Sequence, residues 1–93
     1  MNKPCSLNRT TELYLTTFNR ILQKMMCKMS NAKLTNSISH NFIVQMIPHH
    51  EAAIEMSENI LKYTSNDSLQ NIASNIITEQ TTSIENMLSI KKN

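Results

Sequence analysis

The stretch that decides the fold, residues 42–60, reads FIVQMIPHHEAAIEMSENI. One set of its side chains recurs at alternating steps of four and three residues, the spacing of a single face of an α-helix. This row consists of Phe42, Met46, His49, Ala53, Met56 and Ile60. A second apolar row lies beside it, consisting of Ile43, Ile47, Ile54 and Leu61. We therefore predict a long helix over about residues 38–64 with a broad apolar face.

Two flanking segments, about residues 7–32 and 67–90, have the same periodicity. The inward side of the first consists of Tyr14, Phe18, Ile21, Leu22, Met25, Met29 and Ala32. The inward side of the third consists of Leu69, Ile72, Ala73, Ile76, Ile77, Gln80, Ile84, Met87 and Leu88. Short polar links force long helices into antiparallel neighbours. The sequence therefore predicts one all-α domain over residues 1–93, an antiparallel up-down-up bundle of three long helices. A fourth helix would cover the remaining apolar surface, so we expect a homo-oligomer, with a dimer favoured.

The composition excludes several classes of function. The 93 residues include no glycine, two prolines and 17% charged side chains. Phosphate-binding loops and dinucleotide-binding turns need glycine, because their backbone takes positive φ and approaches a phosphate closely. Nucleotide-binding folds are thereby excluded. In the links, Asn31, Asn36 and Asn66 are the residues we expect at left-handed turn positions.

Charge and cysteine content bear on partners and compartment. The first fourteen residues have no apolar run typical of a secretory signal, and no apolar stretch is long enough for a membrane span, so we expect a cytoplasmic protein with no membrane contact. Cys5 and Cys27 form no CxxC pair and are expected to be free thiols. The net charge of +2 is too small to indicate nucleic acid. A basic stripe on the outer face of the first helix consists of Arg9, Arg20, Lys24 and Lys28.

Pro48, His49 and His50 form the most informative motif. A proline inside a helix removes one backbone hydrogen bond and costs about 3 kcal/mol, so a compensating feature is expected here. The two histidines follow directly and lie about 100° apart around the helix. Apolar surroundings favour the neutral imidazole, which is the form that binds a metal.

The side chains expected opposite His49 are soft ligands. Ala53 leaves room there, and the candidates across the bundle are Met25 and Met29 of the first helix and Met87 or Gln80 of the third. Imidazole and thioether together suit Cu(I) better than harder divalent ions.

Two other interpretations remain open. Seven methionines in a chain with few aromatic residues fill core gaps, and a buried histidine is satisfied by a partner such as Gln80. The protein would then be a metal-free helical oligomerisation or interaction module with a buried His/Gln network. An enzyme is the third interpretation, and we expect none, because no inward nucleophile, carboxylate or oxyanion donor accompanies the histidines. Glu51, Glu55 and Glu58 are expected on the opposite, solvated face.

Residues 42–56 with Leu69-Gln70-Asn71-Ile72-Ala73, Gln80, Ile84 and Met87 resemble the bacterial family called domain of unknown function 305. The methionine-rich first helix is similar to that of short clostridial-type members. The resemblance implies a ferritin-like helical bundle, and some secreted members are implicated in copper binding through Met and His side chains. It carries over to Met46, His49, His50, Met56, Gln80 and Met87. Ser39 and Ser83 replace acidic residues common in the family.

The sequence therefore predicts a small intracellular protein that binds a soft metal, copper above all, in metal handling or storage. His49 and Met46 are the favoured ligands. The other candidates are His50, Met25, Met29, Met56 and Met87, with Gln80 as the hydrogen-bond partner of a ligand.

Overall fold

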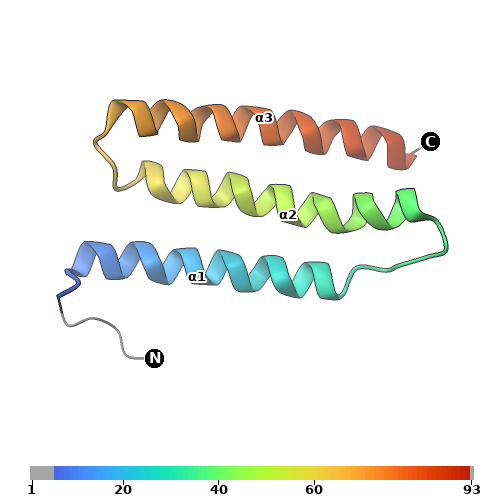
Figure 1. Cartoon of the computed structure of the whole chain (residues 1–93), viewed down its shortest axis with the longest axis horizontal. Coiled ribbons are helices and arrows are strands. Elements are labelled where there is room, and N and C mark those ends of the chain that lie inside the picture. Colours follow the sequence, from blue (N-terminus) through green and yellow to red (C-terminus); the bar gives the residue numbers. More distant parts are fainter. Residues whose placement is uncertain (1–5, 93) are drawn as a thin grey trace.

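The computed structural model describes residues 6–92, with side chains placed up to residue 90. It contains three helices, α1 (Arg9–Ser30), α2 (Ile38–Leu61) and α3 (Asp67–Lys92), and no strand within the described residues. They run antiparallel in the order up, down, up (Figure 1). The predicted all-α class and helix order are confirmed.

Side-chain caps set where the helices begin. In each case the capping oxygen accepts a hydrogen bond from the backbone N–H three residues later, at 2.8 Å for Asn8, 3.1 Å for Ser37 and 2.9 Å for Asn66. Such a bond satisfies one of the N–H groups that lack a partner in the first helical turn. The first helix starts later than the expected residue 7 because Asn8 occupies the capping position.

The links close without left-handed residues, so the expectation of such positions at Asn31, Asn36 and Asn66 is wrong. No residue of the described part takes positive φ. Asn31 has φ −97° and ψ 4°, and its Nδ2 donates to the Cys27 carbonyl at 2.8 Å, which satisfies a carbonyl at the end of α1. In the next link, the Asn41 side chain both accepts from Thr35 N and donates to Thr35 O at 2.8 Å. Side-chain amides thus shape these turns in a chain without glycine.

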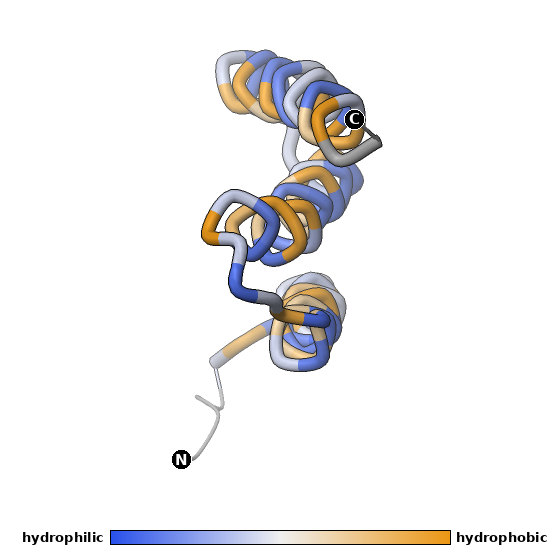
Figure 2. Tube along the Cα trace, turned by 90° about the vertical axis from the view of Figure 1, so that its right-hand side faces the viewer, coloured by the Kyte–Doolittle hydropathy of each residue, from blue (hydrophilic) through white to orange (hydrophobic). Residues whose placement is uncertain are grey.

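The three helices form a flat layer with α2 in the middle. α2 packs against both neighbours, while the backbones of α1 and α3 do not approach each other anywhere in residues 6–92. The Cα extents are 50 × 33 × 13 Å, so one dimension is far smaller than the other two. The molecule is therefore one helix thick, as Figure 2 shows along the helices.

The buried apolar side chains are few and lie in two separate interfaces. Ile21 and Ala52 are buried where α1 meets α2, and Ile43, Ala73 and Met87 where α2 meets α3. Each helix faces its neighbours along narrow edges, so most apolar side chains of the layer stay partly exposed.

Ion pairs connect α1 to α2. Lys24 Nζ bonds to Glu55 Oε2, and Lys28 Nζ lies 3.5 Å from Glu51 Oε1. The expectation that these lysines line an outer face is therefore wrong, because they face the acidic side of the neighbouring helix. Pairs this exposed contribute little, about 0–1 kcal/mol, so they fix the register of the helices more than they stabilise them.

Candidate metal site

Contacts of α2 with α1 and α3 show which neighbouring helix each side of α2 faces. Glu51 and Glu55 face α1 through their ion pairs, and the buried Ser57 lines a groove together with residues of α3. Successive helical residues turn by about 100°, which puts Met46 and His50 on the same side of α2 as Ser57. The side chains of this candidate site therefore project towards α3.

The register between α2 and α3 shows which α3 residues lie opposite. Ser57 and Ala73 line the same groove at the connected end of the two helices. Two heptads further from that end, Ile43 and Met87 are both buried. Because antiparallel helices rise equally, His50 and Gln80 lie level with each other halfway between these pairs. Met87 then lies level with Ile43, which is within one turn of Met46 and about 10 Å along the helix axis from His50.

One hydrogen bond selects the neutral tautomer of His50. Its Nδ1 lies 2.9 Å from the Met46 carbonyl oxygen. A carbonyl only accepts, so Nδ1 carries a hydrogen, and in the neutral imidazole the lone pair is therefore on Nε2. The same arrangement orients metal-binding histidines in many proteins. His50 is half-buried, and it is therefore held in a form that can bind a metal through Nε2.

His49 lies beside His50 but is exposed, so the expectation of apolar surroundings for it is wrong. Within the row from Phe42 to Ile60, Phe42 and His49 are exposed on an open side of the layer, while the other members are half-buried. The two imidazole centroids are 6.1 Å apart, with ring planes at 59°. Two imidazoles on one ion, with metal–nitrogen distances of about 2.0 Å, place their centroids at most about 6.4 Å apart. The observed spacing lies within this limit.

A family model described as "Domain of unknown function (DUF305)" matches residues 12–91. The chain belongs to this family. The match includes nearly all of α1, so it extends well beyond the resemblance seen from residue 42 onward. None of the curated proteins matches the chain.

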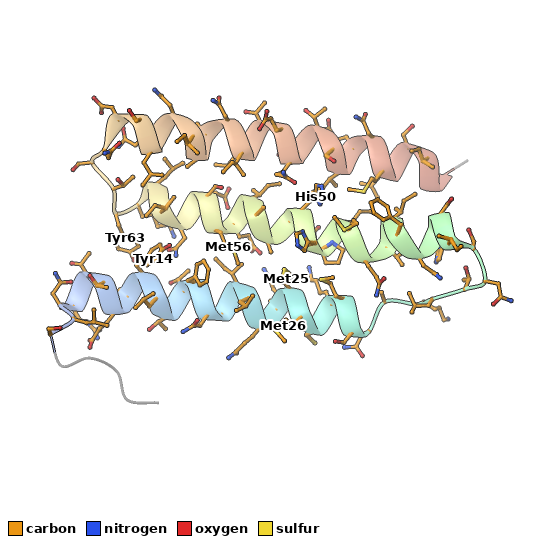
Figure 3. All side chains as sticks on the ribbon, viewed as in Figure 1. Tyr14, Met25, Met26, His50, Met56 and Tyr63 are labelled. Carbon is orange, nitrogen blue, oxygen red and sulfur yellow. The ribbon has the colours of Figure 1, made fainter. Side chains whose placement is uncertain are left out.

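The other predicted ligands of this DUF305 chain lie elsewhere. Met25 and Met29 are on α1, on the far side of α2 from Met87, and the backbones of α1 and α3 do not approach each other in the described residues. Figure 3 places Met25 and Met56 between α1 and α2, and His50 on the side of α2 towards α3. Met56 follows Met46 by ten residues, about 15 Å along the helix. One ion therefore cannot be shared by all the candidate methionines.

Acidic ligands are absent from the candidate site. The part of this DUF305 chain that the structure describes contains no group of three or more His, Cys, Asp or Glu side chains able to hold a metal. Cys27 is an exposed free thiol on α1, and Cys5 lies outside the described residues. The site is thus built from imidazole and thioether alone: Met46, His49, His50 and Met87.

Sequence reasoning missed the Met46 carbonyl as a functional group. The spacing of Met46 and His50 could have indicated it. Residues four apart on a helix lie one above the other, so a histidine side chain can reach back to the carbonyl of the preceding turn. It also missed that α1 and α3 stay apart, which no single helix pattern reveals. None of the three helices is long and apolar enough to cross a membrane, within the described residues.

Proposed function

We propose that this protein binds a soft metal ion, Cu(I), in metal handling or storage. The observation that carries the proposal is the hydrogen bond from His50 Nδ1 to the Met46 carbonyl. It leaves Nε2 of a half-buried imidazole free, one turn from a thioether and next to a second imidazole. Met46, His49 and His50 would hold the ion, with Met87 of α3 on the opposite wall and Gln80 level with His50.

The chemistry of the donors favours copper in its reduced state. Thioethers are soft and neutral, and they select Cu(I) over Mg²⁺, Ca²⁺ or Mn²⁺, which prefer carboxylate oxygen. No carboxylate cluster within residues 6–92 competes for a harder ion. The bound ion would supply neither a nucleophile nor an acid, so we assign the protein a binding role and no catalytic one.

The test is an anaerobic Cu(I) titration against a competing chelator. We expect His50→Ala and Met46→Leu each to weaken binding at least about 10-fold, the order of magnitude seen when groups that support a metal ligand are removed. His40→Ala is the matched control, because His40 is the third histidine and its Nε2 lies 3.0 Å from the Lys33 carbonyl, away from the site. Equal affinities for wild type, His50→Ala and Met46→Leu would refute the proposal.

We further propose that the protein works in the cytoplasm as a homo-oligomer, a dimer. The exposed free thiol of Cys27 supports a reducing compartment. The flat shape supports self-association.

A metal-free interaction module is the second candidate function. The observation that favours it is the placement of His50 level with Gln80, between the buried Ile43–Met87 and Ser57–Ala73 layers. A polar pair there would fix the register of the helices, as polar core residues do in coiled coils. Protein purified anaerobically without stoichiometric metal, together with a His50→Leu variant that keeps its fold but changes oligomeric state, would favour this alternative.

A further inference from the structure

The flat layer leaves more surface exposed than a folded chain of this mass requires. A monomeric protein of 10.7 kDa exposes about 5,500 Å², and this chain exposes 6,900 Å². The Cα radius of gyration is 16.0 Å, whereas about 12 Å is typical of a compact domain of this length. An exposed surface this much larger than that of a compact monomer points to a protein partner that covers part of it.

The exposed apolar side chains gather on one face of the layer. We call it the open face, and it contains the groove of about 320 Å³ that all three helices line. Helical spacing from the groove residues places seven of the large exposed apolar side chains on it: Leu15, Met26, Ile38, Phe42, Leu69, Ile72 and Ile90. On the opposite face, the same spacing places Leu13 and Leu88. Figure 3 shows Met25, Met56 and Tyr14 near the α1–α2 seam and Met26 beyond α1.

Charged side chains also distinguish the two faces, because they gather on the face opposite the open face. The face opposite the open face holds a pocket of about 210 Å³ whose walls include Arg20, Lys24, Glu55, Glu58 and Lys62. Among the described side chains, Glu79 is the one charged group that helical spacing places on the open face, near its α3 edge. Interface centres are depleted in charged residues in this manner.

We propose that the open face is the interface of a homodimer in which two copies stack face to face. A second copy fits because the apolar face is as long and wide as the layer itself, 50 × 33 Å, and is therefore matched by an identical face. A stable dimer buries about 800 Å² per partner, roughly half of that face. The two layers together would form the compact two-layer core that one copy lacks.

His49 connects this interface to the proposed function. It is exposed on the open face, next to His50. In the dimer it is covered, so the ion site would be closed from water by the second copy. This last step rests on the proposed copper binding, whereas the dimer itself does not.

Sedimentation velocity of metal-free protein tests the interface. We expect wild type to sediment at twice 10.7 kDa at micromolar concentration. Phe42→Glu with Ile72→Glu, at positions 60% and 54% exposed in one copy, should raise the dimer dissociation constant at least about 100-fold. Leu13→Glu with Leu88→Glu is the matched control, with 41% and 45% exposure on the opposite face, and should leave it unchanged.

If the Phe42→Glu, Ile72→Glu variant does not fold, hydroxyl-radical footprinting of the wild-type protein tests the same interface. In the dimer, Met26 and Phe42 should be protected, while Leu13 and Leu88 react at the rate of exposed side chains. A wild type that stays helical and monomeric at about 100 μM, a hundredfold above a micromolar dissociation constant, would assign the face to another protein or a membrane and overturn the proposal. Equal dissociation by both glutamate pairs would also overturn it. Copper affinity is measured separately, so a dimer without copper binding and copper binding without a dimer are distinct results.

Discussion

Replacing Asn59 by leucine should stabilise the protein, although Asn59 is the least exposed large side chain in the described part, at 2%. Its Nδ2 donates to the Tyr14 carbonyl at 3.1 Å, while its Oδ1 is buried without a hydrogen-bond partner. The lost hydrogen bond costs about 1 kcal/mol, and removing a buried unpaired acceptor returns about 1–3 kcal/mol. The Tyr14 carbonyl keeps its helical bond within α1, so no new unpaired group is created. Leucine has a similar size and adds buried apolar surface.

We expect Asn59→Leu to raise the free energy of unfolding by about 1–3 kcal/mol. Urea unfolding followed by far-ultraviolet circular dichroism measures it, with all proteins at one concentration because association adds to stability. Asn59→Ala should destabilise by leaving a cavity, and Asn75→Leu, at an exposed site on α3, should change stability by less than about 0.5 kcal/mol. A loss of more than 1 kcal/mol (about a fivefold change in the unfolding equilibrium) in Asn59→Leu would refute the reasoning and show that Oδ1 has a partner, such as water in the adjoining pocket.

Three further predictions concern the helices. Pro48→Ala should raise the urea midpoint, with a net gain of about 1 kcal/mol, because the Val44 carbonyl regains a helical donor; a lower midpoint would show that this carbonyl already has a partner. Ser37→Ala should lower the free energy of unfolding by about 1 kcal/mol through loss of the α2 cap, whereas Ser37→Asn should retain it. A double-mutant cycle between Lys24 and Glu55 should give a coupling below about 1 kcal/mol that vanishes in 1 M salt, where the screening length is about 3 Å; a coupling that survives salt would contradict the exposed geometry.

The helices could be predicted because their periodicity depends on burial alone. A row such as Phe42, Met46 and Met56 shows which side of a helix avoids water, whatever covers it. The same row does not show whether the cover is another helix of the chain or another molecule. Sequence reasoning placed this row inside the bundle and expected a second copy to cover the remaining apolar surface, whereas the structure leaves Phe42 60% exposed. The flat layer was therefore not predictable from the helix patterns.

The candidate site was predictable in part for a related reason. Met46 and His50 are four residues apart on one helix, so their proximity follows from helical geometry. Whether Met29 or Met87 joins them depends on how α1 and α3 sit around α2, which is a tertiary property. The pairing of His49 with the α1 methionines stays a prediction, and the α2–α3 register places Met87 within one turn of Met46.

The central position of α2 makes the chain a linear array of two helical hairpins that share one helix. Every helix–helix contact joins neighbours in sequence, so stability is close to a sum of nearest-neighbour terms, as in repeat proteins. Changes at Ile21 and at Ala73 should then add without coupling. We therefore expect α1 to detach more readily than the α2–α3 hairpin opens. Met46, His50 and Met87 all belong to that hairpin, so the residues proposed to hold the ion can persist through a partial opening that frees the whole N-terminal helix.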